Sequence, residues 1–265
     1  MACHRAQKQA IHQAGAKAVI RVAVTGAAGR MGSECVRTIQ AADDLELVGA
    51  VDRSGSGEFV GSLSDVPEFD VLVEFTHAES AYRFSLEAMQ RGAAPVIGAS
   101  GLSADQLNDL AQTSKETGVP GLLIPNFAIG AVLMMKFAAE AAKYLPNVEV
   151  LEMHHDKKID APSGTAIRTA ELIAEARRAA PNPDPTEAVK AEGARGGTVE
   201  GVPVHSVRLP GLIAHQKVLF GGEGEALRFE HDSMNRLSFM EGVKLAVRGV
   251  RSLDGFAIGL DKVMD

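Results

Sequence analysis

Short apolar segments alternate with helix-like segments throughout residues 19–126, and this alternation constrains the fold more than any other feature of the sequence. The segments are apolar on successive residues, which is typical of parallel strands buried on both faces. The predicted strands are Val19–Gly26, Leu45–Asp52, Asp70–Thr76, Pro95–Ala99 and Val119–Asn126. The predicted helices are Arg30–Ala42, Ala78–Arg91 and Ser103–Thr117. This order predicts an α/β fold with a Rossmann-like parallel sheet and helices on both faces.

Two of these helices are preceded by the spacing of a capping box, in which a hydroxyl and a carboxyl or amide side chain cap the first turn reciprocally. The pairs are Thr76 with Glu79, and Ser103 with Gln106. They predict helix starts directly after the third and fourth strands.

The pattern changes after residue 126. The predicted elements there are a helix at Ala128–Tyr144, a strand at Val148–Met153, a helix at Ser163–Ala179, β-rich segments over Thr198–His231 and a helix at Ser238–Arg251. Three prolines within Pro181–Pro185 predict a loop. The glycine turns of the β-rich part favour a mixed or antiparallel sheet. We therefore expect a disordered extension (1–18), a dinucleotide-binding domain (19–126 and 237–265) and a smaller α+β domain (127–236).

The charge and cysteine content exclude several functions. The formal net charge of -7 argues against nucleic acid as a partner, because an acidic surface repels phosphate. No run of 18 apolar residues occurs, so no membrane-spanning helix and no membrane partner are expected. Cys3 and Cys35 have neither disulfide nor zinc spacing, and Cys35 is expected to be a buried helix residue. The cytoplasm is the expected compartment.

The first predicted strand runs into a glycine-rich loop, Gly26–Gly32. Glycine allows the backbone to turn sharply and to approach a phosphate closely, and the N-terminus of the following helix favours an anion. The second strand ends at Asp52, 20 residues after Gly32, where a carboxylate can hold ribose hydroxyls. A glycine turn alone is compatible with any strand and helix. The strand–loop–helix–strand–acid order favours a dinucleotide site.

Asp52 is followed by Arg53. A carboxylate at this position favours NADH, whereas a neighbouring guanidinium, aided by Arg30, attracts the 2′-phosphate of NADPH. We predict that both cofactors are used. Later strand ends should face the same ligand, at Thr76–His77, Gly98–Ser100 and 124–127; His77 also fits a simple helix-start residue. The predicted cofactor-binding residues are Gly26, Ala27, Ala28, Gly29, Arg30, Met31, Asp52, Arg53, Gly98, Ala99, Ser100, Ile124, Pro125, Asn126 and Phe127.

A cationic segment follows the strand of the second domain. Two histidines and two lysines fall within residues 154–158, and Ser163-Gly164-Thr165 then opens a helix. Charge runs of this kind are often solvated loops, and the histidines lack a convincing zinc ligand set, so no metal is expected. Histidine is suited to proton transfer near neutral pH, and a helix start binds anions. The segment therefore also fits a pocket for a small carboxylate that receives a hydride and a proton.

The same segment resembles the signature E-x-H-H-x-x-K-x-D-A-P-S-G-T-A of the 4-hydroxy-tetrahydrodipicolinate reductase family, matched from Glu152 to Ala166. The loop G-x-x-G-R-M-G, the segment Gly98–Gly101 and the pair Asn126-Phe127 also resemble that family, and the similarity covers about residues 20–265. Asp156 falls in a variable position of the signature.

The resemblance implies that NAD(P)H reduces a cyclic dicarboxylate, (4S)-4-hydroxy-2,3,4,5-tetrahydrodipicolinate, to tetrahydrodipicolinate in lysine and diaminopimelate biosynthesis. It implies catalytic roles for His154 and Lys158, and substrate binding by His155, Ser163, Gly164 and Thr165. It also implies a homotetramer joined through the sheet of the second domain.

Two rival functions remain at this point: another dehydrogenase, which should lack the intact signature, and a nicotinamide-sensing or scaffold protein, which should bind cofactor without turnover. One structural tension also remains, because neighbouring residues such as His154 and His155 point to opposite faces of a strand. For both to line one pocket, the strand must end or twist there.

Overall fold

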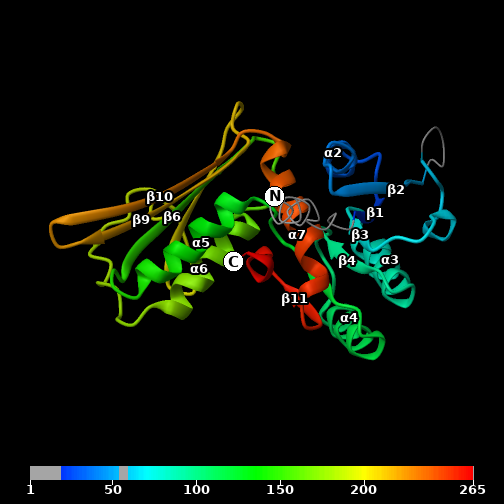
Figure 1. The fold of residues 1–265 in the computed structure, drawn as a ribbon. Coiled ribbons are helices and arrows are strands. Elements are labelled where there is room, and N and C mark those ends of the chain that lie inside the picture. The colour runs from blue at the N-terminus through cyan, green and yellow to red at the C-terminus, as the bar shows by residue number, and fades with distance from the viewer. Residues whose placement is uncertain (1–18, 54–58, 265) are drawn as a thin grey trace, which may run out of the picture. The chain divides into compact units, whose positions relative to one another are not determined.

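The computed structural model describes residues 19–53 and 59–264 (Figure 1). The predicted extension, 1–18, lies outside the described residues. The chain divides into two compact units. Of the described residues, the first contains those up to Leu123 and Lys244–Ile258, and the second contains Ile124–Val243 and those from Gly259 onward.

The first unit holds a six-stranded sheet with the order β11-β5-β4-β3-β1-β2. All five strand pairs are parallel. The strands are β1 (Ile20–Thr25), β2 (Leu45–Val51), β3 (Val71–Glu74), β4 (Ala94–Ile97), β5 (Gly121–Leu123) and β11 (Phe256–Ile258). The helices are α2 (Arg30–Gln40), α3 (Ala78–Gln90) and α4 (Ala104–Thr117), with short 3-10 turns at Leu63–Asp65 and Val250–Ser252. The predicted Rossmann-like parallel sheet is confirmed; strand β11 was not predicted.

Burial on both faces explains the unbroken apolar strands of this sheet. Val22, Ala23 and Val24 are successive residues of β1, and each is fully buried. On one face, Ala23 packs with residues of α3 such as Ala88, and Ile97 of β4 packs with Leu110 of α4. Helices α3 and α4 lie side by side (Figure 1). Parallel strands covered on both sides are the expected result of this sequence pattern.

Only one of the two predicted capping boxes forms. Ser103 accepts a hydrogen bond from the Gln106 amide, and the Gln106 side chain accepts one from the Ser103 amide. The prediction for Thr76 and Glu79 is wrong. His77 is the N-cap of α3, without a side-chain cap, and the Thr76 hydroxyl donates to the His77 carbonyl instead.

The second unit holds a five-stranded mixed sheet with the order β10-β9-β6-β8-β7. Its strands are β6 (Asn147–His154), β7 (Gly197–Val199), β8 (Val202–Arg208), β9 (Ala214–Gly222) and β10 (Glu225–Ser233). Its helices are α5 (Ile129–Ala142) and α6 (Gly164–Ala176), with 3-10 turns at Arg236–Phe239 and Leu260–Val263. Helix α7 (Met240–Gly249) begins in this unit and ends in the first. Only β6 and β8 pair in parallel; the other pairs are antiparallel.

Helices α5 and α6 lie side by side along one face of this sheet (Figure 1). The covered face buries Val150, Val218 and Phe220 against Ala170 and Ile173 of α6. Residues of β6 alternate in burial along the strand, as expected when helices cover one face only.

The chain divides at Leu123/Ile124 and Val243/Lys244 rather than at 126/127 and 236/237, and the described residues from Gly259 onward belong to the second unit. Leu260 explains the last difference, because it is buried in the turn that contacts α5. The dinucleotide-binding and substrate-binding roles of the two units stay predictions. Within the described residues, no helix is both long and apolar enough to cross a membrane.

Candidate active site

A cavity of about 430 Å³ lies at the carboxyl ends of β1, β2 and β3 in the first unit. Strand β1 lies between β2 and β3, so the strand order reverses at this point. Such a reversal opens a crevice at the strand ends, where α/β sheets bind ligands. The lining residues are Gly26, Gly29, Val51, Asp52, Arg53, Gly61, Phe75, Thr76, His77, Ser80, Arg83 and Phe84.

The glycine loop meets the steric requirements of a phosphate cradle. Gly26 has a φ of +69°, and a Cβ there would lie 2.7 Å from the Phe75 carbonyl oxygen. A Cβ on Gly32 would lie 2.1 Å from the Gly26 carbonyl oxygen. Helix α2 begins at Arg30 without a side-chain cap, and its first amides have no partner within the helix. The loop therefore fits the pyrophosphate of a dinucleotide.

Charged side chains of both signs line the same cavity. Asp52 follows β2, and its Oδ2 accepts a hydrogen bond of 3.3 Å from the Ala28 amide. Arg53 lies beside it in sequence, and Arg83 comes from α3. A carboxylate with two guanidinium groups suits the adenosine ribose and an added phosphate.

The structure brings only part of the predicted cofactor set to this cavity. Gly26, Gly29, Asp52 and Arg53 line it, and so do Thr76 and His77. Ala27 is buried, Ala28 and Arg30 are exposed, and Met31 is half-buried at the start of α2. Gly98, Ala99 and Ser100 follow β4 and are not among the lining residues. Ile124, Pro125, Asn126 and Phe127 belong to the second unit. These assignments stay predictions.

A buried carboxyl group lies at the end of β3. Glu74 is fully buried, and its Oε1 accepts a 2.7 Å hydrogen bond from the Thr76 amide. Burial raises the pKa of Glu74 to about 7, against the opposing effect of hydrogen bonds from Thr76 and Thr25. A protonated carboxyl here is consistent with Oε2, which is buried without a hydrogen-bond partner among the described residues.

In the second unit, the predicted catalytic cluster begins where β6 ends. His154 is the last residue of β6, and His155 lies in the loop that follows, where it is exposed. The strand therefore ends between His154 and His155, which is the condition under which both side chains can line one pocket. His154 stays on the helix-covered face with Val150 and Glu152, since alternate strand residues share a face.

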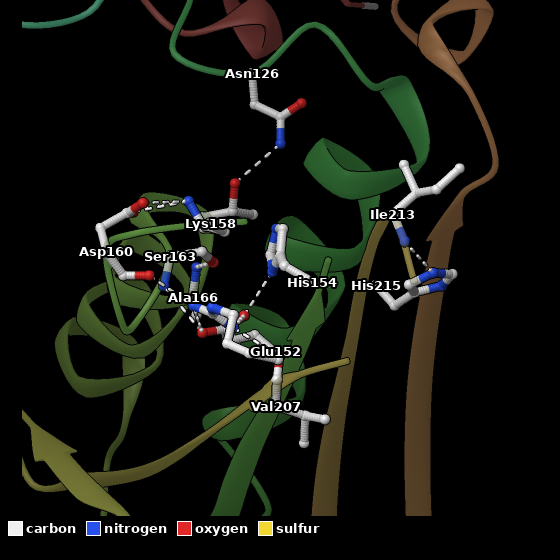
Figure 2. Close-up of polar contacts among 12 residues, drawn as sticks. Asn126, Glu152, His154, Lys158, Asp160, Ser163, Ala166, Val207, Ile213 and His215 are labelled. Carbon is white, nitrogen blue, oxygen red and sulfur yellow. Dashed lines mark hydrogen bonds and ion pairs between the residues drawn. The ribbon is translucent and has the colours of Figure 1, made fainter. Parts of the chain in front are cut away.

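The fully buried carboxylate of Glu152 lies next to the His154 ring, below it in Figure 2. His154 Nδ1 lies 2.6 Å from Glu152 Oε2. Burial by itself raises the pKa of the Glu152 carboxyl, but hydrogen bonds, led by the one from Arg208, outweigh burial and hold that pKa below its usual value. Burial lowers the pKa of His154 and outweighs the opposite effect of Glu152. His154 is thus a neutral imidazole beside an ionised carboxylate at neutral pH.

The next residues form a turn that carries the predicted second proton donor. Lys158 Nζ lies 2.7 Å and 2.8 Å from the two carboxylate oxygens of Asp160. Figure 2 shows Lys158 turned toward Asp160. Asp156 is exposed, so its negative charge faces solvent. An ion pair at an exposed edge is weak and can exchange for a ligand carboxylate.

Helix α6 begins beside this turn. Ser163 is its N-cap, and the Ser163 hydroxyl accepts a 3.2 Å hydrogen bond from the Ala166 amide. The amides of Gly164 and Thr165 have no partner within the helix, and a Cβ on Gly164 would meet nothing within 4 Å. Asn126 donates from Nδ2 to the Thr165 hydroxyl over 3.1 Å. That hydroxyl accepts from Asn126, so it keeps its own proton to donate to an anion.

Sequence reasoning missed several residues of both sites. Arg83 lies in the first two turns of a helix that follows a strand end. The predicted helix Ala78–Arg91 could therefore have indicated that Arg83 lies near the ligand. Glu152 was visible only as part of a signature. Arg208 had no local signal, because it reaches Glu152 through the parallel pairing of β8 with β6, 56 residues away in sequence.

Neither a metal site nor a reactive thiol accompanies the cluster in the described part of the chain. No group of three or more His, Cys, Asp or Glu residues that could hold a metal ion occurs there. Cys35 is buried in α2, as predicted, and burial raises the pKa of its thiol.

Two family models match the chain. The model described as "Dihydrodipicolinate reductase, N-terminus" matches residues 20–127, and the one described as "Dihydrodipicolinate reductase, C-terminus" matches residues 130–264. A curated relative from Halalkalibacterium halodurans, named 4-hydroxy-tetrahydrodipicolinate reductase, is 47% identical over 264 residues, which is 93% of this chain and 100% of the relative. A Bacillus cereus protein of the same name is 45% identical over 263 residues, covering 93% and 99%.

Solved structures agree with these relatives. A dipicolinate-bound dihydrodipicolinate reductase from Paenisporosarcina sp. TG-14 superposes with a TM-score of 0.85 at 41% identity, covering 93% of this chain and all of that chain. The myo-inositol 2-dehydrogenase of Lactobacillus plantarum superposes with a TM-score of 0.60 at 12% identity, covering 92% and 93%, and shares the fold alone.

Proposed function

The chain belongs to the dihydrodipicolinate reductase family, and we propose that it reduces (4S)-4-hydroxy-2,3,4,5-tetrahydrodipicolinate to tetrahydrodipicolinate with NAD(P)H. This step belongs to lysine and diaminopimelate biosynthesis. The observation that carries the proposal is the intact signature folded as one cluster: His154, Lys158 and the α6 start lie together in one unit, beside a fully buried carboxylate.

The reaction balances with one proton and one water. The substrate, NAD(P)H and a proton yield tetrahydrodipicolinate, NAD(P)⁺ and water. When bound, the reduced nicotinamide supplies the hydride. We propose that the protein supplies the proton and holds both carboxylates, which requires an acid–base group and two anion sites.

His154 and Lys158 are the proposed proton-transfer residues. His154 engages Glu152 through Nδ1, so its Nε2 is the atom that exchanges a proton with the ligand. Lys158 can leave Asp160 to stabilise negative charge that develops on the substrate.

Two carboxylate sites are proposed near this pair. The Gly164 and Thr165 amides with the Thr165 hydroxyl form one site, at a helix N-terminus capped by Ser163. His155 with the two lysines of residues 154–158 forms the other. Support comes from the dipicolinate-bound reductase of Paenisporosarcina, because dipicolinate is a planar cyclic dicarboxylate.

The proposed cofactor site is the cavity of the first unit. Membership of the family supports an NAD(P)-dependent reductase with an N-terminal nucleotide-binding unit. We propose that both NADH and NADPH are accepted, because Asp52 suits a free ribose, whereas Arg53 and Arg83 suit a 2′-phosphate. A preference above about a thousandfold, or roughly 4 kcal/mol, would contradict this.

We further propose a cytoplasmic homotetramer that assembles through the sheet of the second unit. The face opposite α5 and α6 offers Leu219, 37% exposed, in the middle of β9. Sedimentation velocity tests the assembly, and a monomer at micromolar concentration would contradict it. Cell fractionation tests the compartment, where recovery in a membrane fraction would count against it.

Turnover tests the proposed function. The wild-type protein should oxidise NADH, followed at 340 nm, when freshly generated substrate is added, and dipicolinate should inhibit. His154→Ala should lower kcat by on the order of a hundredfold or more while the Kd for NADH changes little, because it removes proton transfer rather than nucleotide contacts. His155→Ala should instead mainly raise KM. NADH binding without oxidation would favour a cofactor sensor and contradict the proposal.

A further inference from the structure

Glu152 is a charged residue in a fully buried position, and its carboxylate is saturated with donors. Oε2 lies 2.6 Å from His154 Nδ1 and accepts from Arg208 Nη1 over 2.9 Å. Oε1 accepts from Arg208 Nη2 over 2.7 Å and from the Ser163 amide over 3.3 Å. A buried carboxylate is costly unless its partners satisfy it, so this arrangement requires all of them.

Arg208 ties three parts of the site together. Its guanidinium binds Glu152 bidentately, and Nη2 also donates to the Asp160 carbonyl oxygen over 2.7 Å. Asp160 is the residue that holds Lys158. Arg208 lies opposite His154 in the parallel pairing of β6 and β8. One ion pair therefore contacts the histidine, the lysine turn and the start of α6.

The carboxylate also fixes which nitrogen of His154 carries the proton. An ionised carboxylate only accepts hydrogen bonds, so Nδ1 must be the protonated nitrogen of the neutral ring. The lone pair is then on Nε2. Without the carboxylate, a neutral imidazole in water distributes between both tautomers and is free to rotate.

We propose that Glu152 and Arg208 are positioning residues for proton transfer: together they hold His154 as the Nδ1–H tautomer with Nε2 directed to the ligand, and they align the Lys158 turn with the α6 start. This inference rests on the proposed role of His154. Glu152 is fully buried, so in this proposal the pair acts through His154 and the loop that follows it.

The chain offers a matched control three residues earlier on the same strand. Glu149 accepts from Arg195 over 2.6 Å and lies 2.8 Å from His205 Nε2, so it has the same kinds of partner. It faces the side of β6 opposite Glu152, as the alternation of the strand dictates. Compared with wild type at the same state of assembly in sedimentation velocity, Glu149→Gln should leave kcat, KM and the His154 tautomer unchanged.

The test combines kinetics with ¹⁵N NMR of histidine-labelled full-length protein, with the His154 signal assigned from His154→Gln. Wild type should show the Nδ1–H tautomer. Glu152→Gln should shift His154 toward a mixture, move its titration to lower pH because a carboxylate that raises its pKa is gone, and lower kcat on the order of a hundredfold. KM should change much less, and NADH affinity should stay within twofold.

Arg208→Lys decides the matter if Glu152→Gln does not fold. Lysine keeps the charge but cannot make the bidentate pair with Glu152. The turn that carries Lys158 should then be held less firmly, so kcat should fall by about tenfold or more. The proposal is overturned if wild-type His154 is the Nε2–H tautomer. It is also overturned if folded Glu152→Gln loses activity without any change in the His154 signals, or if a folded variant at either position keeps kcat within threefold.

These readouts separate two kinds of failure. A wild-type protein without turnover would contradict the proposed function but would leave the tautomer measurable. A wild-type protein that turns over with the wrong tautomer would contradict only the positioning role.

Discussion

Glu74 carries the only carboxyl among the described residues whose pKa is raised to about 7. It is fully buried at the end of β3, directly before Phe75 and Thr76 of the cavity lining. A carboxyl buried with few donors costs less free energy when it is protonated. The folded state therefore binds a proton that the unfolded chain releases near pH 4.5, and stability must depend on pH through this group.

Glu74→Gln should remove that dependence. Because the folded pKa lies above the unfolded value, the favourable contribution is complete below about pH 4.5 and is lost as pH rises through 7. The loss amounts to about 3 kcal/mol. Urea unfolding should show the free energy of unfolding of Glu74→Gln rising relative to wild type by roughly this amount between pH 5 and pH 8. Exposed Glu223→Gln is the control, and a pH-independent difference for Glu74→Gln would refute the argument.

Arg83 should influence cofactor preference. A guanidinium that contacts the 2′-phosphate strengthens NADPH binding and leaves NADH nearly unaffected. Arg83→Ala should therefore raise the KM for NADPH about tenfold, or roughly 1.4 kcal/mol, with the KM for NADH changed less than threefold. Arg37→Ala on α2 is the control, because Arg37 is exposed outside the cavity lining. An equal rise in the KM for both cofactors would rule out a contact between Arg83 and the 2′-phosphate.

At the scale of elements, the glycine loop and the start of α2 form a tightly packed corner. Their contact depends on Gly32, where the backbone of the helix meets that of the loop without room for a side chain. This packing sets the direction of α2 toward the cavity. A substitution in the corner should therefore weaken ligand binding even where the new side chain does not contact the ligand.

Gly32→Ala should disrupt that corner. The new Cβ would lie 2.1 Å from the Gly26 carbonyl oxygen and 2.8 Å from Ala27 Cα, so backbone must move. We expect a loss of roughly 2 kcal/mol or more in the free energy of unfolding and at least a tenfold weaker Kd for NADH. Gly221→Ala is the control, because a Cβ there meets nothing within 4 Å. A variant with normal stability and NADH affinity would show that the corner is not a constraint.

The sequence was most informative about elements whose pattern is local. The strand–helix alternation, the Ser103 capping box and the glycine turn at Gly26 each have a short-range physical cause, and each forms. The Thr76 capping box did not form because His77, directly before Ala78, is the N-cap of the helix. Strand β11 was missed because three residues after a helix carry too little pattern.

The candidate sites show the same limit. The signature placed His154 and Lys158 close together after one strand, but the Arg208 contact depends on the register between β6 and β8, which no local pattern specifies. Arg83 reaches the cavity because α3 follows the end of β3.

For the whole molecule, the central claim is hydride transfer from a nicotinamide to a cyclic dicarboxylate. In the proposed function, each unit carries half of the requirement: the first the proposed nucleotide cavity and the second the proposed proton-transfer cluster with its anion sites. Neither half alone distinguishes a reductase from a protein that merely binds its cofactor. Only the transfer of hydrogen from the cofactor to the substrate makes that distinction.

The most direct measurement is therefore isotopic. With [4,4-²H₂]NADH and the hydroxylated tetrahydrodipicolinate substrate, mass spectrometry of the product should show tetrahydrodipicolinate carrying one deuterium per NADH oxidised. The same reaction with His154→Ala should give the labelled product far more slowly. Oxidation of NADH without label in the product, or bound NADH that is never oxidised, would contradict the account.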